Sequence, residues 1–244
     1  MTAVVAQGRG PLMVLAPSFG RDSEDFGAVA AGLAAAGMRV LRPQPRGVGG
    51  TGELTGLTYA DWAGDLLAAV AAERGGPAIL LGHAAGSRYV RAAAAIAPAA
   101  VRGVVLAAAA RPGPPAPEQA ADLARCVAAE TTPAECRAAL RRSFFAPGND
   151  VDAWLTGWHP ATARAQRASA PSDGWERAGG VPVLDLIGAQ DPWRPPATRE
   201  AVAAALGPRV SVAVVDGASH ALLPERPDAV VTAVARWAAT LSPH

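Results

Sequence analysis

The sequence contains no lysine, only two cysteines and few aromatic residues. Its basic residues are all arginine; the 22 of them nearly balance 21 acidic residues, so the formal net charge is +1. Without an excess of positive charge, the chain lacks the electrostatic field that binds nucleic acid. Two cysteines, Cys126 and Cys136, are too few for the disulfide framework of a small secreted domain. We expect both to be free thiols on helices.

Long apolar runs are also absent. No stretch approaches the roughly 18 apolar residues of a membrane-spanning helix, and the alanine-rich stretch 92–100 is interrupted by Pro98. Residues 1–9 lack the basic leader and the apolar stretch of about 7–15 residues that mark a secretory signal. We therefore expect a cytoplasmic protein that does not associate with membranes and exists as a monomer or homodimer.

Alanine is abundant instead, at about a quarter of the 244 residues, which we attribute to coding bias rather than to chemistry. The length suits a single α/β domain, which commonly has about 200–250 residues. Apolar runs alternate with segments of helical periodicity. Strands are predicted at residues 11–16, 38–41, 77–82, 101–109, 182–188 and 210–215, and helices at 25–36, 58–74, 85–97, 197–206 and 228–241. This alternation predicts a mostly parallel sheet with helices on both faces.

Residues 111–180 interrupt the alternation. They begin with a proline-rich stretch, contain no predicted strand and suggest several short helices, one starting with Thr132 as N-cap and Glu135 at N3. Aromatic residues gather here, and Trp154 and Trp158 are spaced to share one face of a helix. We predict a helical lid at 111–180, inserted into a core formed by residues 1–110 and 181–244.

Unusual residues follow four of the predicted strands, where an open α/β sheet collects its ligands. Ser18-Phe19-Gly20 follows the first strand and Gly82-His83-Ala84-Ala85-Gly86 the third, while Asp191 follows the fifth and His220 the last. Two glycines four apart between a strand and a helix predict a strained elbow that presents its middle residue. Asp191 followed by His220 matches the acid and base of an acyl-transfer triad in that chain order.

Three stretches of the chain resemble the α/β-hydrolase superfamily, and the resemblance extends over essentially the whole length. They are residues 80–86, 188–192 and 217–227. The resemblance implies the α/β-hydrolase fold, catalysis by His220 and Asp191 without a cofactor, and an oxyanion hole made by the main-chain N–H groups of Phe19 and Ala85. At the nucleophile position the family has serine and this chain has Ala84, so the elbow is similar to a bacterial subgroup with Gly-His-Ala-x-Gly.

Ala84 cannot form a covalent intermediate, which leaves three explanations open. The chain is a non-covalent hydrolase or lyase-like enzyme with an Asp–His base, an engineered Ser→Ala variant of a serine esterase or lactonase, or a ligand-binding protein without catalysis. We favour the first, because Pro17-Ser18 and Gly86-Ser87-Arg88 also depart from the family's usual turn and elbow flank. The expected substrate is a small, largely apolar molecule with a carbonyl or ester-type group.

Several further residues are candidates for substrate binding: Ser18, His83, Phe144, Phe145, Trp154, Trp158, His159 and Trp193. Two have an equally simple structural explanation, as a turn hydroxyl (Ser18) and a surface histidine (His159). For His83 we favour the structural explanation, a packed side chain below the site. Arg21 and Arg46 are expected on the solvated surface. No His, Cys, Asp and Glu residues have metal-ligand spacing, so no metal is expected. The glycine-rich stretch 46–52 lacks the ending of a phosphate-binding loop.

Overall fold

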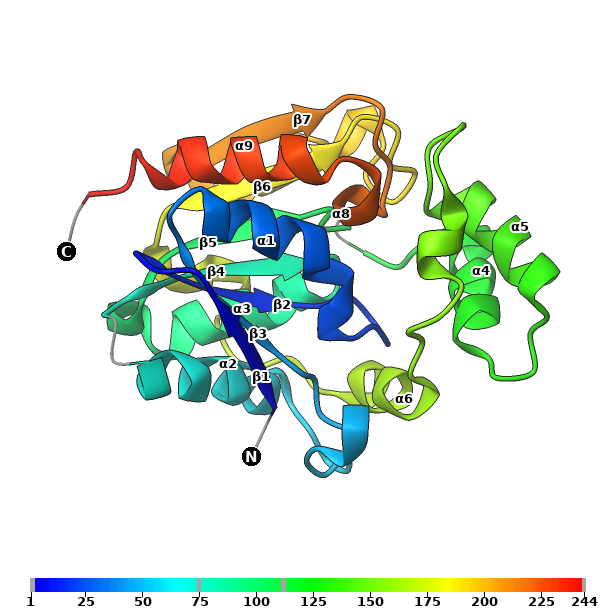
Figure 1. Cartoon of the computed structure of the whole chain (residues 1–244), viewed down its shortest axis with the longest axis horizontal. Coiled ribbons are helices and arrows are strands. Elements are labelled where there is room, and N and C mark those ends of the chain that lie inside the picture. The colour runs from blue at the N-terminus through cyan, green and yellow to red at the C-terminus, as the bar shows by residue number, and fades with distance from the viewer. Residues whose placement is uncertain (1–2, 74–75, 111–112, 243–244) are drawn as a thin grey trace.

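A seven-stranded sheet forms the centre of the computed structural model, which describes residues 3–73, 76–110 and 113–242 (Figure 1). The strands lie in the order β1-β3-β2-β4-β5-β6-β7. β1 runs antiparallel to β3, and every other neighbouring pair is parallel. The strands are β1 (Val4–Gln7), β2 (Leu12–Ala16), β3 (Arg39–Pro43), β4 (Ala78–His83), β5 (Val101–Ala107), β6 (Val183–Gly188) and β7 (Val210–Val215). The predicted α/β-hydrolase fold is confirmed.

Helices cover both faces of the sheet. On one face lie α1 (Gly27–Ala35) and α9 (Pro227–Ala238), and on the other α2 (Tyr59–Glu73), α3 (Gly86–Ile96) and α7 (Ala201–Leu206). Successive residues of a strand point to opposite faces, so Leu80 packs with the α2 and α3 layer while Ile79 and Leu81 pack with α1 and α9. Burial on both faces explains why the central strands are continuous apolar runs.

Several predicted elements of the core differ from the structure. β1 was not predicted; it is short and mostly exposed, so no buried face marks it in the sequence. The helix predicted at 197–206 is a 3₁₀ turn at Pro196–Thr198 followed by α7, and the helix predicted at 228–241 ends at Ala238. Three predicted features lie partly outside the described residues: the missing leader at residues 1–2, the helix end at 74–75 and the lid boundary at 111–112.

Residues 113–180, here called the inserted segment, connect β5 to β6. They form α4 (Pro117–Val127), α5 (Pro133–Ser143) and α6 (Pro160–Ala168), with 3₁₀ turns at Val151–Trp154 and Trp175–Gly180. Figure 1 shows α4 and α5 beside the sheet, outside the two helical layers. The predicted start of α5 is confirmed, since Thr132 Oγ1 accepts from the Glu135 N–H and the Glu135 carboxylate accepts from the Thr132 N–H.

The helix predicted through Trp154 and Trp158 is wrong. Trp154 ends a 3₁₀ turn and Trp158 lies in the irregular stretch that follows. Their rings nevertheless meet edge to face, with centroids 6.0 Å apart.

Among the residues that the structure describes, no helix combines the length and the apolar character that crossing a membrane requires.

Candidate active site

Ala84 lies at a sharp turn between β4 and α3. Its φ is +45°, a left-handed conformation that costs an alanine about 1–2 kcal/mol. The turn also requires glycine on both sides, because a Cβ on Gly86 would lie 2.3 Å from the Ala16 carbonyl oxygen and one on Gly82 would lie 2.5 Å from the Gly86 backbone. Ser87 Oγ donates to the Gly82 carbonyl at 2.8 Å and closes the turn. The geometry of a nucleophile elbow is therefore present around an alanine.

Asp191 and His220 come together at the carboxyl ends of β6 and β7. His220 Nδ1 lies 3.0 Å from Asp191 Oδ2, and both side chains are almost fully buried. The other carboxylate oxygen, Oδ1, accepts from the Trp193 N–H at 2.8 Å. A carboxylate only accepts, so Nδ1 carries a proton, and in the neutral imidazole Nε2 bears the lone pair. Nε2 makes no hydrogen bond to any described residue, which leaves it able to accept a proton.

The loop after β2 and the start of α3 supply two unused main-chain donors. In the part of the chain that the structure describes, the N–H groups of Phe19 and Ala85 donate to no acceptor. The loop itself is held in place, because the Gly20 N–H donates to Gln166 Oε1 at 2.7 Å and the Arg21 N–H to the Ser18 carbonyl at 3.2 Å. Two free N–H groups on a fixed backbone can stabilise negative charge on a substrate oxygen.

His83 is fully buried and supports the His220 backbone. Its Nε2 donates to the His220 carbonyl oxygen at 2.9 Å. Burial, and to a smaller degree the neighbouring His220, lowers the pKa of His83 to about 3, so the ring is neutral at ordinary pH. The structure therefore places His83 as a packed side chain below the site, with no surface exposed to a substrate.

Aromatic side chains from the inserted segment and from the turn after β6 lie against the imidazole of His220 and against His83 below it. The Trp193 ring stacks on it at 4.9 Å and Phe144 meets it at 5.8 Å. Trp154 lies edge-on to His83 at 5.6 Å. Phe144, Phe145, Trp154 and Trp193 are buried in one cluster, and Trp158 packs against it. The structure thus brings these predicted residues together, and their contact with a substrate stays a prediction.

Two other predicted residues lie at the loop after β2. Ser18 is buried, and its main-chain oxygen accepts from Arg21. His159 is partly exposed, with Nε2 2.9 Å from Asp22 Oδ2 and its N–H donating to the Gly20 carbonyl. His159 therefore fastens the inserted segment to this loop.

The prediction that Arg21 is a solvated surface residue is wrong. Its guanidinium is buried, pairs with Asp25 through two hydrogen bonds and lies 4.6 Å from the Trp158 ring and 5.0 Å from the Trp154 ring. Burial raises the pKa of Asp25 in spite of this pair. The i,i+4 spacing of Arg21 and Asp25 is the one sequence signal that points to the pair. Arg46 is also paired, with Asp65 at 2.6 Å.

A second arginine that sequence reasoning missed fixes the turn after Asp191. Arg194 is completely buried and lies 2.6 Å from Asp185 in β6. It also donates to the carbonyl oxygens of Ala109 and Thr198. Arg194 is three residues from Asp191. The ion pair between Arg194 and Asp185 therefore anchors residues 188–192, here called the acid turn, to the centre of the sheet.

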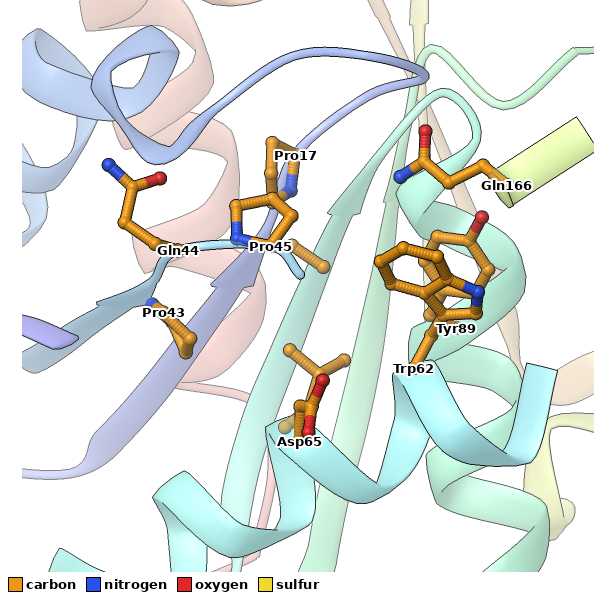
Figure 2. A pocket seen from close by; sticks show the side chains of 10 residues that line it. Pro17, Pro43, Gln44, Pro45, Trp62, Asp65, Tyr89 and Gln166 are labelled. Atoms are coloured by element: carbon orange, nitrogen blue, oxygen red, sulfur yellow. The ribbon is translucent and has the colours of Figure 1, made fainter. Parts of the chain in front are cut away.

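A small cavity lies beside the loop after β2 (Figure 2). Its volume is about 30 Å³, enough for one or two waters. Trp62 and Tyr89 form one wall, stacked at 5.4 Å, and Pro17 lies opposite. Its lining does not include Ala84, Asp191 or His220, so it is separate from the dyad. Within the described ranges, no three His, Cys, Asp or Glu side chains are grouped to hold a metal ion.

Comparisons with known proteins agree with the fold. The chain aligns over its full length with a candidate non-heme bromoperoxidase, BpoC, from Mycobacterium tuberculosis H37Rv, at 25% identity, 97% coverage of that chain and a TM-score of 0.83. The esterase RhEst1 from Rhodococcus sp. ECU1013 is 26% identical over 99% of this chain and 96% of its own, with a TM-score of 0.79. A thermophilic esterase from Thermogutta terrifontis shares the fold, with a TM-score of 0.79 at 23% identity over 98% of this chain and 93% of that one.

None of the curated proteins matches the chain. A family model described as the alpha/beta hydrolase family matches residues 13–233. This range includes the elbow around Ala84, the turn with Asp191 and the loop with His220. With sheet order, elbow and family model in agreement over most of its length, this chain belongs to the α/β-hydrolase family.

Proposed function

We propose that this protein is an enzyme that uses the Asp191–His220 pair as a general base, without a covalent intermediate. The observation that carries the proposal is the buried dyad, in which Asp191 holds Nδ1 and leaves Nε2 of His220 without a partner among the described residues. Its proposed substrate is a small, largely apolar molecule with a carbonyl or ester-type group. The similar structure from Rhodococcus is an esterase, which supports that substrate class.

In the proposed mechanism, Nε2 of His220 takes a proton from water or from the substrate, and Asp191 stabilises the imidazolium that forms. In hydrolysis, the deprotonated water attacks the carbonyl carbon, and the tetrahedral intermediate then breaks the C–O bond to the alcohol, which takes the proton back from His220. In lyase-like chemistry, a proton taken from carbon gives an enolate, which expels a leaving group from the β-carbon. The free N–H groups of Phe19 and Ala85 would stabilise the oxyanion in either case. General-base assistance contributes about 10²- to 10⁴-fold. We propose that the inserted segment covers the site and that its aromatic residues contact the apolar part of the substrate.

The test measures turnover of short-chain nitrophenyl esters and lactones by three proteins. His220→Ala should abolish turnover, while Ala84→Gly should change it little, because position 84 makes no bond to the substrate. Turnover that persists in His220→Ala would overturn the dyad mechanism. A ligand that binds and is recovered unchanged, with no turnover dependent on His220, would identify a binding protein instead.

The alternative of a serine esterase that has lost its nucleophile is favoured by one observation. Ala84 keeps a positive φ that an alanine adopts only under strain and that an elbow nucleophile requires. In that case Ala84→Ser should restore ester hydrolysis and labelling by a fluorophosphonate probe. Absence of both gains would argue against this alternative.

A further inference from the structure

Glu225, the last residue of α8 (Leu222–Glu225), is a buried carboxylate without an ionic partner. No arginine or histidine in the described part of the chain lies within ion-pair distance of it. It is held instead by three N–H donors. Oε1 accepts from the Ala146 N–H and from Asn149 Nδ2, both at 2.6 Å, and Oε2 accepts from the Ser219 N–H at 2.7 Å. A buried carboxylate is tolerated when hydrogen bonds of this kind replace water.

The three donors belong to two separate parts of the chain. Ser219 directly precedes His220 in residues 217–221, here called the His220 loop. Ala146 and Asn149 belong to residues 143–149 of the inserted segment, here called the anchor segment. Glu225 therefore joins the loop that carries the proposed base to the inserted segment.

Two more hydrogen bonds join the same pair of segments on either side of His220. Asn149 Nδ2 also donates to the Gly217 carbonyl oxygen at 2.9 Å, and the Ala221 N–H donates to the Phe144 carbonyl oxygen at 2.8 Å. The His220 loop is thus fastened to the anchor segment before and after the histidine.

Asp191 is fastened to the same anchor segment through Trp193. The Trp193 indole N–H donates to the Ser143 carbonyl oxygen at 2.6 Å, and the Trp193 main-chain N–H donates to Asp191 Oδ1 at 2.8 Å. The indole ring also stacks on His220. Both members of the dyad therefore depend on the position of residues 143–149.

We infer that Glu225 is a positioning residue that keeps His220 at Asp191 by bonding the His220 loop to the anchor segment. Consequently the anchor segment is a fixed part of the active-site scaffold, and any opening for substrate must occur elsewhere in the inserted segment. This inference rests on the proposed function only in taking Asp191 and His220 as the reacting pair.

The decisive variant is Glu225→Gln, which keeps the side-chain size and places an NH₂ group against at least one N–H donor. Amide exchange at Ser219 and Ala221 should accelerate roughly 10- to 100-fold, the effect of losing a hydrogen bond to a charged group. In NMR spectra the His220 Nδ1–H signal should weaken or disappear through faster exchange with water. Asp228→Asn is the matched control, because it removes an exposed carboxylate three residues away that makes no hydrogen bond to the loop.

A second variant keeps the test decisive if Glu225→Gln does not fold. Asn149→Ala removes the hydrogen bonds to Glu225 and Gly217 from a half-buried position, and should accelerate exchange in the His220 loop about 3- to 10-fold. The inference is overturned if the variant that folds leaves the loop and the Nδ1–H signal unchanged. It is also overturned if faster exchange spreads equally through β4 and β5, since that indicates a general loss of stability.

These measurements need no turnover, so they separate this inference from the proposed function. A loosened His220 loop in a protein without His220-dependent turnover supports the positioning role and contradicts the dyad enzyme. If turnover is found, Glu225→Gln should lower kcat more than it raises KM, because the substrate itself does not contact Glu225. A change confined to KM would contradict the positioning role.

Discussion

At the scale of single residues, burial decides the charge of His83 and links it to stability. The folded pKa is about 3 and the unfolded value about 6.5, so between these values the unfolded chain binds more protons than the folded one. Stability therefore falls as the pH is lowered from about 6.5 toward 3. By pH 4 the loss attributable to this one ring is about 3 kcal/mol.

The variant His83→Gln tests this linkage, because glutamine can still donate to the His220 carbonyl oxygen but does not titrate. Urea unfolding at pH 7 and at pH 4 should show the wild type losing about 3 kcal/mol more than the variant on acidification. His159→Gln is the control for a partly exposed histidine. If wild type and His83→Gln lose the same free energy of unfolding, His83 does not resist protonation in the fold.

The candidate-site residues that follow strands could be predicted from the sequence. Residues whose contacts are with distant parts of the chain could not. Asp191, His220 and Ala84 stand at strand ends marked by glycine or proline, so topology alone brings them to one edge of the sheet. Arg21 packs against Trp158, which lies more than a hundred residues away along the chain. Glu225 accepts a hydrogen bond from Asn149, 76 residues away. No periodicity or local motif encodes such contacts.

At the scale of elements, the elbow depends on how closely α3 approaches the end of β2. A Cβ on Gly86 would meet the carbonyl oxygens of Ala16 and Pro17 at 2.3 and 2.6 Å, and both are backbone atoms that cannot turn aside. Gly64, by contrast, is exposed in the middle of α2 and has no atom within 4 Å of such a Cβ. Substitution of Gly86 therefore tests close packing, whereas substitution of Gly64 tests helix propensity alone.

Gly86→Ala should lower the free energy of unfolding by about 3 kcal/mol, because overpacking against backbone has no inexpensive relief. Gly64→Ala should raise it by about 1 kcal/mol through better helix propensity. Urea denaturation of both variants measures the difference directly. Effects of equal sign and size would show that the approach of α3 to β2 is looser than the structure has it.

Predictions of elements succeeded where burial on both faces leaves a strong pattern and failed where tertiary contacts decide. The strands β2, β4 and β6 were found because every residue in them is buried. The spacing of Trp154 and Trp158 suggested a helix, yet Arg21 donates to the Thr156 carbonyl oxygen between them and packs against both rings. A contact from a distant loop thus replaces the local helical hydrogen bonding that the spacing implied.

At the scale of the whole molecule, the inserted segment is fastened to the core beside both halves of the candidate site, in addition to hydrogen bonds elsewhere such as the one between Trp62 and Ser169. The anchor segment holds the dyad, and α6 holds the loop that follows β2. There Gln166 Oε1 accepts from the Gly20 N–H, and His159, which directly precedes α6, meets Asp22. Thr162 Oγ1 donates to the Arg46 carbonyl oxygen at 2.9 Å, in the loop after β3. One segment therefore holds both the dyad and the loop that carries Phe19.

This double attachment predicts that the inserted segment and the core unfold together. The other three tryptophans, Trp62, Trp175 and Trp237, pack in the core and are replaced by phenylalanine for this measurement. Trp154, Trp158 and Trp193 then report on the aromatic cluster around His220, while far-UV circular dichroism reports chiefly on the helices and strands of the core. Denaturant curves from tryptophan fluorescence and from circular dichroism should coincide, as expected for a single cooperative transition. A fluorescence transition at lower denaturant would mean that the inserted segment leaves the core while the sheet is intact. In that event the hydrogen bonds through Glu225 and Gln166 would be too weak to make the segment part of the active-site scaffold.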